Sequence, residues 1–513
     1  MAKLILDKNM VKKARDYANR IASKVQNFID KNTTTTIERA TIRLLGVDGA
    51  NKDDVPLLNV VVDSFINELG SGILYPFVNA MCFYNVNAQI LSEMISQKEI
   101  DLEKVSKLEK EKVIPEINKV VKNSCLLIKK KRDERTELIK KLGDPKKPWL
   151  YVIVATGNIY EDVVQAKAAV REGADVIAVI RSTAQSLLDY VPYGITTTGY
   201  GGTYATQANF KVIREALDEV ADEVGRYIRQ VNYCSGLAMP EIAVMGAFER
   251  LDMMLNDSLY GIIFRGINTK RTFIDQYFSR MINAAAGVII NTGEDNYLTT
   301  ANAYKAAHTV IASQLINEQF AIFSGLKAEQ IGLGHAFQIN PHLEDSLIYE
   351  IAHAQLVRDL FPDYPIKYMP PTVYKTGDIF FSNLLDGMFN FTGILTNQEI
   401  QLLGMPTEAI HTPFLQDRFI SIKNAKYIFN CAKNLGEQIS FNKDSKIVKR
   451  ANQVLKNAVN LLEEIDDIGL FKAIEKGIFA DIKRDTNSGR GLEGVIKKKE
   501  DYFNSFFTEL KKI

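Results

Sequence analysis

After Trp149 the sequence alternates between short apolar runs, rich in β-branched residues, and longer segments with the spacing of amphipathic helices. A strand followed by a helix, repeated many times, is typical of a parallel sheet covered by helices. The expected strands comprise residues 150–155, 174–180, 227–233, 262–264, 287–290, 330–334 and 366–368, with a last strand near 388–392. The expected helices between them include residues 161–172, 210–225, 272–285, 301–324 and 343–360.

The number and length of these units favour a closed barrel. About eight units occupy roughly 250 residues, the length expected of one (β/α)₈ barrel. An open, doubly wound sheet would normally carry a glycine-rich phosphate-binding turn after its first strand. The turn at this place reads Thr156-Gly157-Asn158. We therefore predict an α/β protein with a (β/α)₈ TIM barrel.

Helical sequence flanks the barrel on both sides. Apolar residues recur at steps of three and four over 7–30, and a Lys- and Glu-rich stretch follows at 98–147. The segment 143–148 has one glycine and two prolines, which is typical of a linker. Beyond about residue 416 the sequence is again helical and charged. We predict an N-terminal helical accessory region at 1–148, the barrel at 149–415 and a C-terminal helical accessory region at 416–513, with both additions wrapping the barrel.

The composition excludes several classes of protein. Lys and Arg number 63 and Asp and Glu number 62, so the chain lacks the basic excess of a nucleic-acid-binding protein. No apolar run approaches the ~18 residues of a membrane span, and the N-terminus lacks the apolar core of a signal peptide. The four cysteines have no metal-ligand spacing, which suits a reducing compartment. We expect a cytoplasmic enzyme that binds neither nucleic acid nor membrane and has no metal site of its own.

Polar residues follow many of the expected strands, and in a barrel the active site forms at the carboxyl ends of the strands. They are Arg181, Ser182 and Ser186 after the second strand, Ser235 after the third, Arg265 after the fourth, Asn291, Glu294, Asp295 and Asn296 after the fifth, His335 at the end of the sixth and Lys367 in the seventh. Arginines, a lysine and hydroxyl groups together suit an anionic ligand such as a phosphate or a carboxylate. The residues alone therefore indicate a barrel enzyme that binds an anion.

Three other features have two interpretations each. His335 suits a satisfied core histidine better than a catalyst. The glycine- and threonine-rich loop 193–207 is either a close approach to a cofactor or a flexible crossover loop. The segment 489–494 matches G-x-G-x-x-G, but no strand precedes it and no βαβ unit follows. We predict a glycine-rich surface loop there rather than a dinucleotide site.

Long stretches of the chain resemble the large (α) subunit of the lysine 5,6-aminomutase family. They are VIAVIRSTAQSLLDYVPYG at 176–194, GYGGTYATQANF at 199–210, VNYCSGLAMPEIAVMGAFERLDMMLNDSLYGIIFR at 231–265, INTGEDNYLTTANAY at 290–304 and GLGHAFQINP at 332–341. TIERATIRLLGVDG at 36–49 extends the resemblance to the N-terminal region. The resemblance implies a radical isomerase that moves the terminal amino group of D-lysine or L-β-lysine to the adjacent carbon, in lysine degradation. It also implies two cofactors, pyridoxal 5′-phosphate and adenosylcobalamin (a cobalt cofactor), which carry the chemistry that side chains cannot perform.

The same resemblance assigns roles to particular residues. It implies a cofactor-binding shell of Arg181, Ser186, Ser235, Tyr260 and Arg265, in which Tyr260 stacks on the pyridine ring. It implies that Asp295, Asn296 and Lys367 bind the substrate, and it places Tyr260, Asp295 and Lys367 among the catalytic residues. A stacking role requires Tyr260 to lie at the barrel mouth, which favours a fourth strand near 251–255 in place of 262–264.

The chain lacks the D-x-H-x-x-G motif that binds the corrin ring. In the family this motif, and the lysine that forms the resting aldimine, belong to a small β subunit, so the resemblance implies a partner subunit that holds most of the cobalamin, in an α₂β₂ heterotetramer. Three alternatives remain: an ornithine 4,5-aminomutase, a cobalamin-dependent mutase without pyridoxal phosphate, and a non-catalytic barrel scaffold. One methylene of substrate length changes binding by only ~1–3 kcal/mol, so the residues alone do not separate lysine from ornithine.

Overall fold

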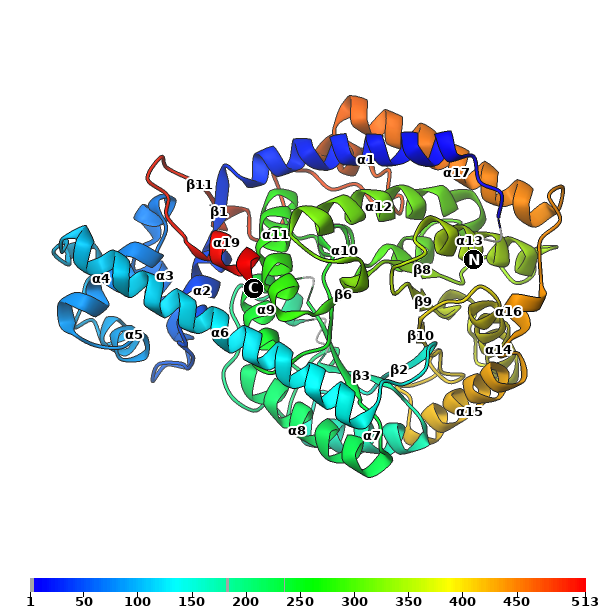
Figure 1. The fold of residues 1–513 in the computed structure, drawn as a ribbon, viewed down its shortest axis with the longest axis horizontal. Helices are drawn as coiled ribbons and strands as arrows, with labels where there is room; N and C mark the ends of the chain where they lie inside the picture. Colours follow the sequence, from blue (N-terminus) through cyan, green and yellow to red (C-terminus); the bar gives the residue numbers. More distant parts are fainter. Residues whose placement is uncertain (1–3, 181–183, 235) are drawn as a thin grey trace.

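The computed structural model describes residues 4–180, 184–234 and 236–513, and its centre is a barrel of parallel strands ringed by helices (Figure 1). The strands are β2 (Trp149–Ile153), β3 (Val176–Ile180), β4 (Arg229–Tyr233), β5 (Met253–Leu255), β6 (Ile289–Asn291), β7 (Ile331–Gly332), β8 (Gly334–Ala336), β9 (Lys367–Met369) and β10 (Ile400–Leu402). In this part of the chain they form one sheet in the order β7-β6-β5-β4-β3-β2-β10-β9-β8. Because only Leu333 separates β7 from β8, the two ends of the sheet meet and the barrel closes on eight strand positions. The predicted TIM barrel is confirmed.

Six of the predicted strands lie where the sequence places them, and two predictions are wrong. Residues 262–264 belong to helix α10 (Ser258–Arg265), and the fourth strand is β5, as the alternative at 251–255 required. Residues 388–392 belong to helix α14 (Ile379–Leu395), and the last strand is β10. Both runs are apolar because each helix packs one face on the barrel, and a short apolar run has the same composition in a buried helix and in a strand.

Helices separate the strands and cover the outside of the barrel. They are α7 (Ile159–Glu172), α8 (Gln207–Val224), α9 (Met239–Phe248), α11 (Thr269–Ala286), α12 (Ala303–Phe323), α13 (Ser346–Leu360), α14 and α15 (Leu415–Cys431). Every residue of α9 is buried, since the N-terminal region covers the side that would otherwise face solvent. This explains why α9 lacks the polar face of an ordinary surface helix.

Side chains alternate between the inside of the barrel and its helical layer, as the pleat of a strand requires. Tyr151, Val231 and Met369 pack inside the barrel, whereas Leu150 and Val152 pack toward the helices. Since Met369 points inward, the alternation places Lys367 on the same inner face of β9. One lysine therefore lies among the apolar side chains of the barrel interior.

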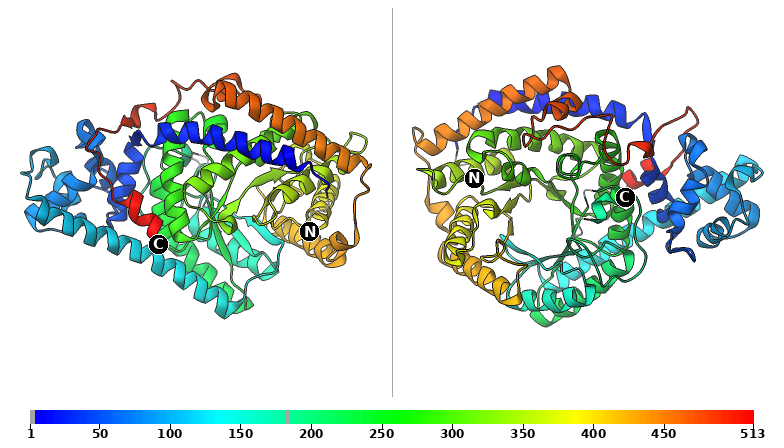
Figure 2. Two further views of the ribbon diagram at one scale, coloured as in Figure 1. Left: turned by 45° about the horizontal axis from the view of Figure 1, so that its top comes forward. Right: turned by 180° about the vertical axis from the view of Figure 1, so that it is seen from behind.

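The N-terminal and C-terminal regions lie side by side on one side of the barrel (Figure 2). Helix α1 (Lys8–Ile29) lies beside α17 (Lys446–Ile468) over α12, and β1 (Asn32–Thr34) pairs antiparallel with β11 (Val495–Lys497). The remaining N-terminal helices are α2 (Thr35–Leu44), α3 (Leu57–Asp63), α4 (Leu74–Tyr84), α5 (Ala88–Ser96) and α6 (Lys110–Leu142). The C-terminal segment adds α16 (Leu435–Gln438), α18 (Leu470–Lys476) and α19 (Phe506–Glu509). The terminal regions thus brace each other as well as the barrel.

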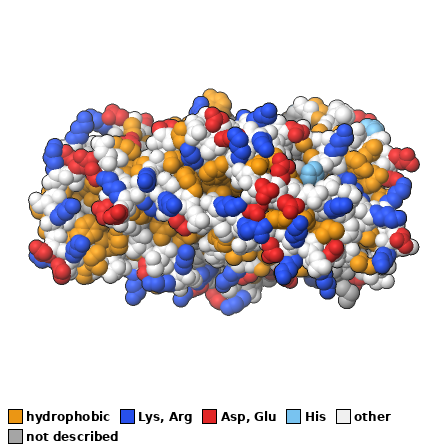
Figure 3. All heavy atoms as spheres, turned by 90° about the horizontal axis from the view of Figure 1, so that it is seen from above, with side chains coloured by type: hydrophobic (Ala, Val, Ile, Leu, Met, Phe, Trp, Pro, Cys, Tyr) orange, Lys and Arg blue, Asp and Glu red, His pale blue; other side chains and the backbone are white. Residues whose placement is uncertain are grey.

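The long helix α6 packs across the outside of the barrel, and Arg135 hydrogen-bonds it to the barrel helix α11. Arg135 donates to the carbonyl oxygens of Ala286 and Gly287, 3.0 and 2.9 Å away, at the carboxyl end of α11. A cation at this end of a helix is favourable, because the unpaired carbonyl groups there carry negative charge. On the face seen in Figure 3 basic and acidic side chains are interspersed. Within the described residues, the helices are all too short or too polar to cross a bilayer.

Candidate active site at the barrel mouth

A buried ion pair joins two of the residues that the sequence assigns to the substrate. Lys367 Nζ lies 2.6 Å from Asp295 Oδ2, and the two side chains are 3% and 0% exposed. Asp295 lies in the short helix η4 (Glu294–Thr299), directly after β6, and Lys367 opens β9. The Asn296 side-chain amide donates to Asp295 Oδ1 at 2.7 Å, so it fixes the orientation of the carboxylate. The structure therefore brings all three predicted substrate residues together.

The surroundings keep Lys367 charged. Burial acts to lower its pKa, but attraction to the Asp295 carboxylate, with smaller contributions from Tyr233 and Tyr260, raises that pKa above the ordinary value. A raised pKa means that the ammonium form persists inside the barrel at neutral pH. Burial raises the pKa of Asp295, against the attraction of Lys367 and the hydrogen bond from Asn296, so the interior favours the charged form of Lys367 more than that of Asp295.

A glycine of β8 makes room for this pair. A Cβ atom on Gly334 would lie 2.5 Å from the Thr292 carbonyl oxygen and 3.3 Å from the Asp295 side-chain carboxyl carbon. The Gly334 amide also donates to the Thr292 hydroxyl at 2.9 Å. The backbones of β8 and of the turn after β6 are therefore packed too closely for a side chain at this position.

Tyr260 and Arg265 lie together at the mouth, on the helix that follows β5. Asp257 caps the start of α10 by accepting from the Leu259 amide at 3.1 Å. Arg265 donates to the Tyr260 hydroxyl at 2.8 Å, and the Tyr260 and Phe264 rings are 5.4 Å apart. Because Tyr260 follows β5, it is at the end of the barrel where a ring-stacking role requires it.

Ser186 occupies the contact between two neighbouring loops. It lies in the short helix η3 (Gln185–Leu187) after β3. A Cβ on Gly236, in the loop after β4, would lie 2.5 Å from the Ser186 Cα atom. The Leu237 amide donates to the Ser186 carbonyl oxygen at 3.1 Å. Arg181 and Ser235, the other predicted members of the shell, and Ser182 lie outside the described residues.

Two acidic residues at the same end of the barrel share one amide. Asn317 Nδ2 is 2.7 Å from Glu294 Oε1 and 3.3 Å from Asp257 Oδ1. Burial, together with the nearby Asp257 charge, raises the pKa of Glu294 to about 8. Asp257 also accepts from the Gly293 amide at 2.9 Å, so it connects the helix of Tyr260 to the turn that leads to Asp295.

Sequence reasoning missed Tyr233 and Asp257. The Tyr233 hydroxyl lies 3.2 Å from that of Tyr151, inside the barrel. Its position at the end of the third predicted strand was the available signal for Tyr233. For Asp257 the available signal was its type as a helix-capping residue, although the apolar run 262–264 that follows has the composition of a strand.

The structure also shows the surroundings of His335, the loop 193–207 and the segment 489–494, each of which has two interpretations from sequence. His335 is fully buried, stacks on Tyr368 with ring centres 4.3 Å apart and contacts Gln398, so it is a core histidine. The loop 193–207 packs against the turn after β2, where a Cβ on Gly157 would lie 2.8 Å from the Gly199 carbonyl oxygen. In the segment 489–494 no dinucleotide-binding βαβ unit forms among the described elements, but Gly491 and Gly494 are buried and only Gly489 is at the surface.

The donor set fits a phosphorylated aromatic cofactor. Tyr260 offers a ring face and Arg265 a guanidinium, both on helix α10, and Ser186 offers a hydroxyl on the short helix η3, all at one end of the barrel. The loops beside them approach through glycines, since a Cβ on Gly293 would lie 2.8 Å from Tyr260 Cβ. Within the described part of the chain, acidic, histidine and cysteine side chains do not gather in threes as a metal ion requires.

Comparison with known proteins agrees with this geometry. A family model described as the D-lysine 5,6-aminomutase TIM-barrel domain of the alpha subunit matches residues 4–509. The lysine 5,6-aminomutase alpha subunit of Acetoanaerobium sticklandii is 56% identical over 98% of both chains. That of Fusobacterium nucleatum subsp. nucleatum is 54% identical over 99% of this chain and 98% of its own.

A more distant relative has another substrate in its name. The D-ornithine 4,5-aminomutase subunit beta of A. sticklandii is 29% identical over 69% of this chain and 50% of its own length. Identity to the two lysine proteins is nearly twice as high and extends through both terminal regions. The chain belongs to the family of lysine 5,6-aminomutase alpha subunits.

Proposed function

We propose that this chain is the large subunit of an isomerase that moves the terminal amino group of D-lysine or L-β-lysine to the adjacent carbon. The observation that carries the proposal is the buried pair of Lys367 and Asp295 within the barrel, next to Tyr260. The chain that contains this pair is 54–56% identical to lysine 5,6-aminomutase alpha subunits over nearly its whole length.

The charges of the pair match those of a diamino acid. Lys367 would bind the substrate carboxylate, and Asp295 would bind an ammonium group. Each substrate charge would replace the partner that the side chain has in the pair, so no buried charge would lose its counter-ion on binding. Asn296 would hold Asp295 in place during this exchange, because it contacts the oxygen opposite to the one that faces Lys367.

The residues at the mouth would hold pyridoxal phosphate. Tyr260 would stack on its ring, and Arg265 and Ser186 would contact its anionic oxygens; by resemblance, Arg181 and Ser235 would complete the shell. Pyridoxal phosphate supplies a carbonyl and a conjugated ring that can bind an amino nitrogen covalently and delocalise its electrons. The role of this chain is to fix the ring beside the Lys367–Asp295 pair and to exclude water.

A second subunit would complete the enzyme. The relatives are named as alpha subunits, which implies a beta partner. We propose a small subunit that holds most of the adenosylcobalamin, in an α₂β₂ assembly. Exposed aromatic side chains on the loops after β3 and β10 (Tyr193, Tyr200 and Phe414) support such a partner over the mouth. All four cysteines are free thiols, which suits the cytoplasmic location that we propose.

The test is an amino-migration assay on the full chain co-expressed with a small subunit of the family. With both cofactors added, D-lysine or L-β-lysine should be converted to the product with the amino group on the adjacent carbon. D-Ornithine should be converted with a much lower kcat/KM. A preference for ornithine, or no conversion of either lysine isomer by an assembled complex, would overturn the proposal.

A further inference from the structure

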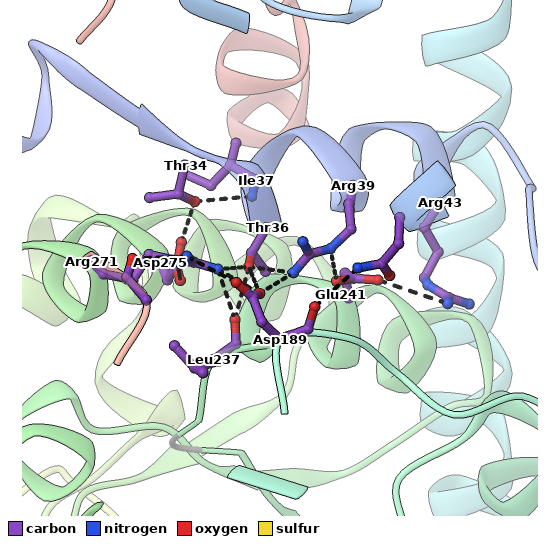
Figure 4. Close-up of polar contacts among 12 residues, drawn as sticks. Thr34, Thr36, Ile37, Arg39, Arg43, Asp189, Leu237, Glu241, Arg271 and Asp275 are labelled. Atoms are coloured by element: carbon purple, nitrogen blue, oxygen red, sulfur yellow. Dashed lines mark hydrogen bonds and ion pairs between the residues drawn. The ribbon is translucent and has the colours of Figure 1, made fainter. Parts of the chain in front are cut away.

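The loops after β3 and β4 are held from outside the barrel by a largely buried polar network (Figure 4). We call it the Asp189 network, and it consists of Thr36, Arg39, Asp189, Leu237 and Arg271. Asp189 belongs to the loop after β3 and follows Ser186 by three residues, and Leu237 follows Ser235 by two. Thr36 and Arg39 belong to the N-terminal helix α2, and Arg271 belongs to α11. The network thus links an accessory region to both loops of the proposed cofactor shell.

Two arginines converge on the Asp189 carboxylate. Arg39 contacts Asp189 Oδ1, and Arg271 Nη2 donates to the same oxygen at 2.9 Å. The Arg39 and Arg271 side chains are 2% and 0% exposed, whereas that of Asp189 is 32% exposed. Burial opposes ionisation of Asp189, but the two guanidinium groups outweigh it and lower its pKa to about 2. The Asp189 carboxylate and the two guanidinium groups are therefore fully charged at any physiological pH.

Each arginine also has a carboxylate partner of its own. Arg39 Nε lies 2.6 Å from Glu241, and Arg271 Nε lies 2.7 Å from Asp275. These ion pairs hold both guanidinium groups in place independently of Asp189. A donor held in this way restricts the position of the loop much more than a freely rotating surface arginine would.

The Thr36 hydroxyl connects the second loop. It donates to the Leu237 carbonyl oxygen at 2.8 Å and accepts from Arg39 Nη2 at 2.9 Å. Arg271 Nη2 contacts the same hydroxyl. One side chain of α2 therefore bridges both arginines and the loop after β4.

The G-x-G-x-x-G segment at 489–494, near the other end of the chain, packs against Arg271 and Leu237 of the network. The Gly491 carbonyl oxygen accepts from Arg271 Nη1 at 3.1 Å. A Cβ on Gly491 would lie 2.5 Å from a Leu237 methyl carbon, and one on Gly494 would lie 2.1 Å from Arg271 Nη1. The glycines of this segment thus permit close packing on Arg271 and Leu237, which is a physical reason for the motif that involves no nucleotide.

We propose that Thr36, Arg39 and Arg271 are positioning residues that set the geometry of the cofactor site through Asp189 and Leu237. This inference rests on the proposed function, in which Ser186 and Ser235 contact pyridoxal phosphate. It predicts that a change in the N-terminal region, outside the barrel mouth, alters cofactor affinity. None of the three residues needs to touch the cofactor.

The test uses the full chain assembled with its small subunit and titrated with pyridoxal phosphate, with binding followed by the absorption of the cofactor. Thr36→Val keeps the shape of the side chain but removes the hydroxyl that serves Leu237 and both arginines. We expect the dissociation constant to rise by about tenfold or more, the scale of leaving buried hydrogen-bonding groups unpaired. Thr36→Ser restores the hydroxyl and should bind within about twofold of the wild type.

The control breaks an ion-paired contact that lies elsewhere and is more exposed, since the side chains of Arg20 and Lys24 are 51% and 56% exposed. Asp466 of α17 also accepts from two cations of the N-terminal region, Arg20 at 2.7 Å and Lys24 at 2.8 Å. Asp466→Asn should lower Tm without changing the affinity for pyridoxal phosphate.

The outcomes separate this inference from the proposed function. A wild-type complex that takes up no pyridoxal phosphate contradicts the proposed function itself. A wild type that binds, with Thr36→Val binding equally well, overturns only the positioning role. The positioning role is also overturned if Asp466→Asn loses affinity to the same degree, or if Thr36→Ser is as weak as Thr36→Val, because the effect would then reflect general stability.

Discussion

Lys367 Nζ lies 2.6 Å from Asp295 Oδ2 inside the barrel, although the two residues are 72 positions apart in the sequence. The pair joins the first residue of β9 to the helix after β6 and lies against the β8 backbone at Gly334. A structural ion pair and the proposed substrate-binding pair therefore coincide in the same two side chains. Substitutions that are measured for both stability and catalysis can separate the structural role from the proposed substrate-binding role.

Lys367→Met should reduce both stability and catalysis. It leaves the Asp295 carboxylate buried without a cation, which typically costs about 3–5 kcal/mol of stability. Loss of the contact to the substrate carboxylate should lower kcat/KM by about 10²-fold or more. Thermal melting and steady-state kinetics of the assembled enzyme measure the two effects.

The double variant Lys367→Met/Asp295→Asn is the control for this prediction. It removes both charges, so most of the stability should return while kcat/KM stays low. If activity returns together with Tm, the pair has only a structural role and neither residue binds the substrate.

Tyr260→Ala should weaken binding of pyridoxal phosphate without unfolding the barrel, because Tyr260 is only half-buried, on a helix outside the strands. Losing the stacked ring should cost about 0.5–1.5 kcal/mol beyond the lost contact area. Tyr260→Phe keeps the ring and removes the hydroxyl that accepts from Arg265, so its affinity should fall less. Equal affinities of wild type and Tyr260→Ala, measured by absorption titration, would exclude the stacking role.

The chain alone should not turn over either lysine isomer, even with both cofactors present. Its five histidines lie outside any D-x-H-x-x-G corrin-binding motif. Adding the purified small subunit should restore product formation, measured by chromatography of the amino acids. Robust turnover by the isolated chain would contradict the two-subunit assignment.

The alternation of short apolar runs with amphipathic segments made most of the barrel predictable. The two wrong strand predictions have physical causes. The run 174–180 fits a strand, because Gly173 and the predicted helix that ends just before it leave room for only a short element, and the structure places β3 there. The runs at 262–264 and 388–392 have the same composition but lie in buried helices, so composition alone does not distinguish them from strands. The capping side chains Asp257 and Asp378 mark the starts of those helices and were the signal to use.

For the site, the sequence identified the types of residue but not the contacts between them. Asp295 and Lys367 are predicted as substrate residues from resemblance, but only the closed barrel brings them into contact. Arg39, Asp189 and Arg271 could not be grouped in advance, because they come from an accessory helix, a mouth loop and a barrel helix. Interactions between distant segments leave no local pattern in a single sequence.

The acidic residues behind the mouth predict how stability changes with pH. The pKa of Glu294 is raised from 4.5 to about 8 by burial and by the Asp257 charge. In the unfolded chain Glu294 ionises near its ordinary pKa, so between about pH 4.5 and 8 the folded protein holds a proton that the unfolded chain has lost. The free energy of unfolding should therefore fall as pH rises through this window, by on the order of a few kcal/mol from this residue.

Glu294→Gln should flatten this dependence, because glutamine keeps the contact to Asn317 but does not titrate. Urea unfolding of the wild type and the variant at several pH values between 5 and 8 measures the difference in slope. Glu463→Gln is the control: a hydrogen bond from Tyr17 lowers the pKa of Glu463, so it titrates below the window and its removal should leave the slope unchanged. Parallel curves for wild type and Glu294→Gln would show that Glu294 is already ionised in the folded protein across this window.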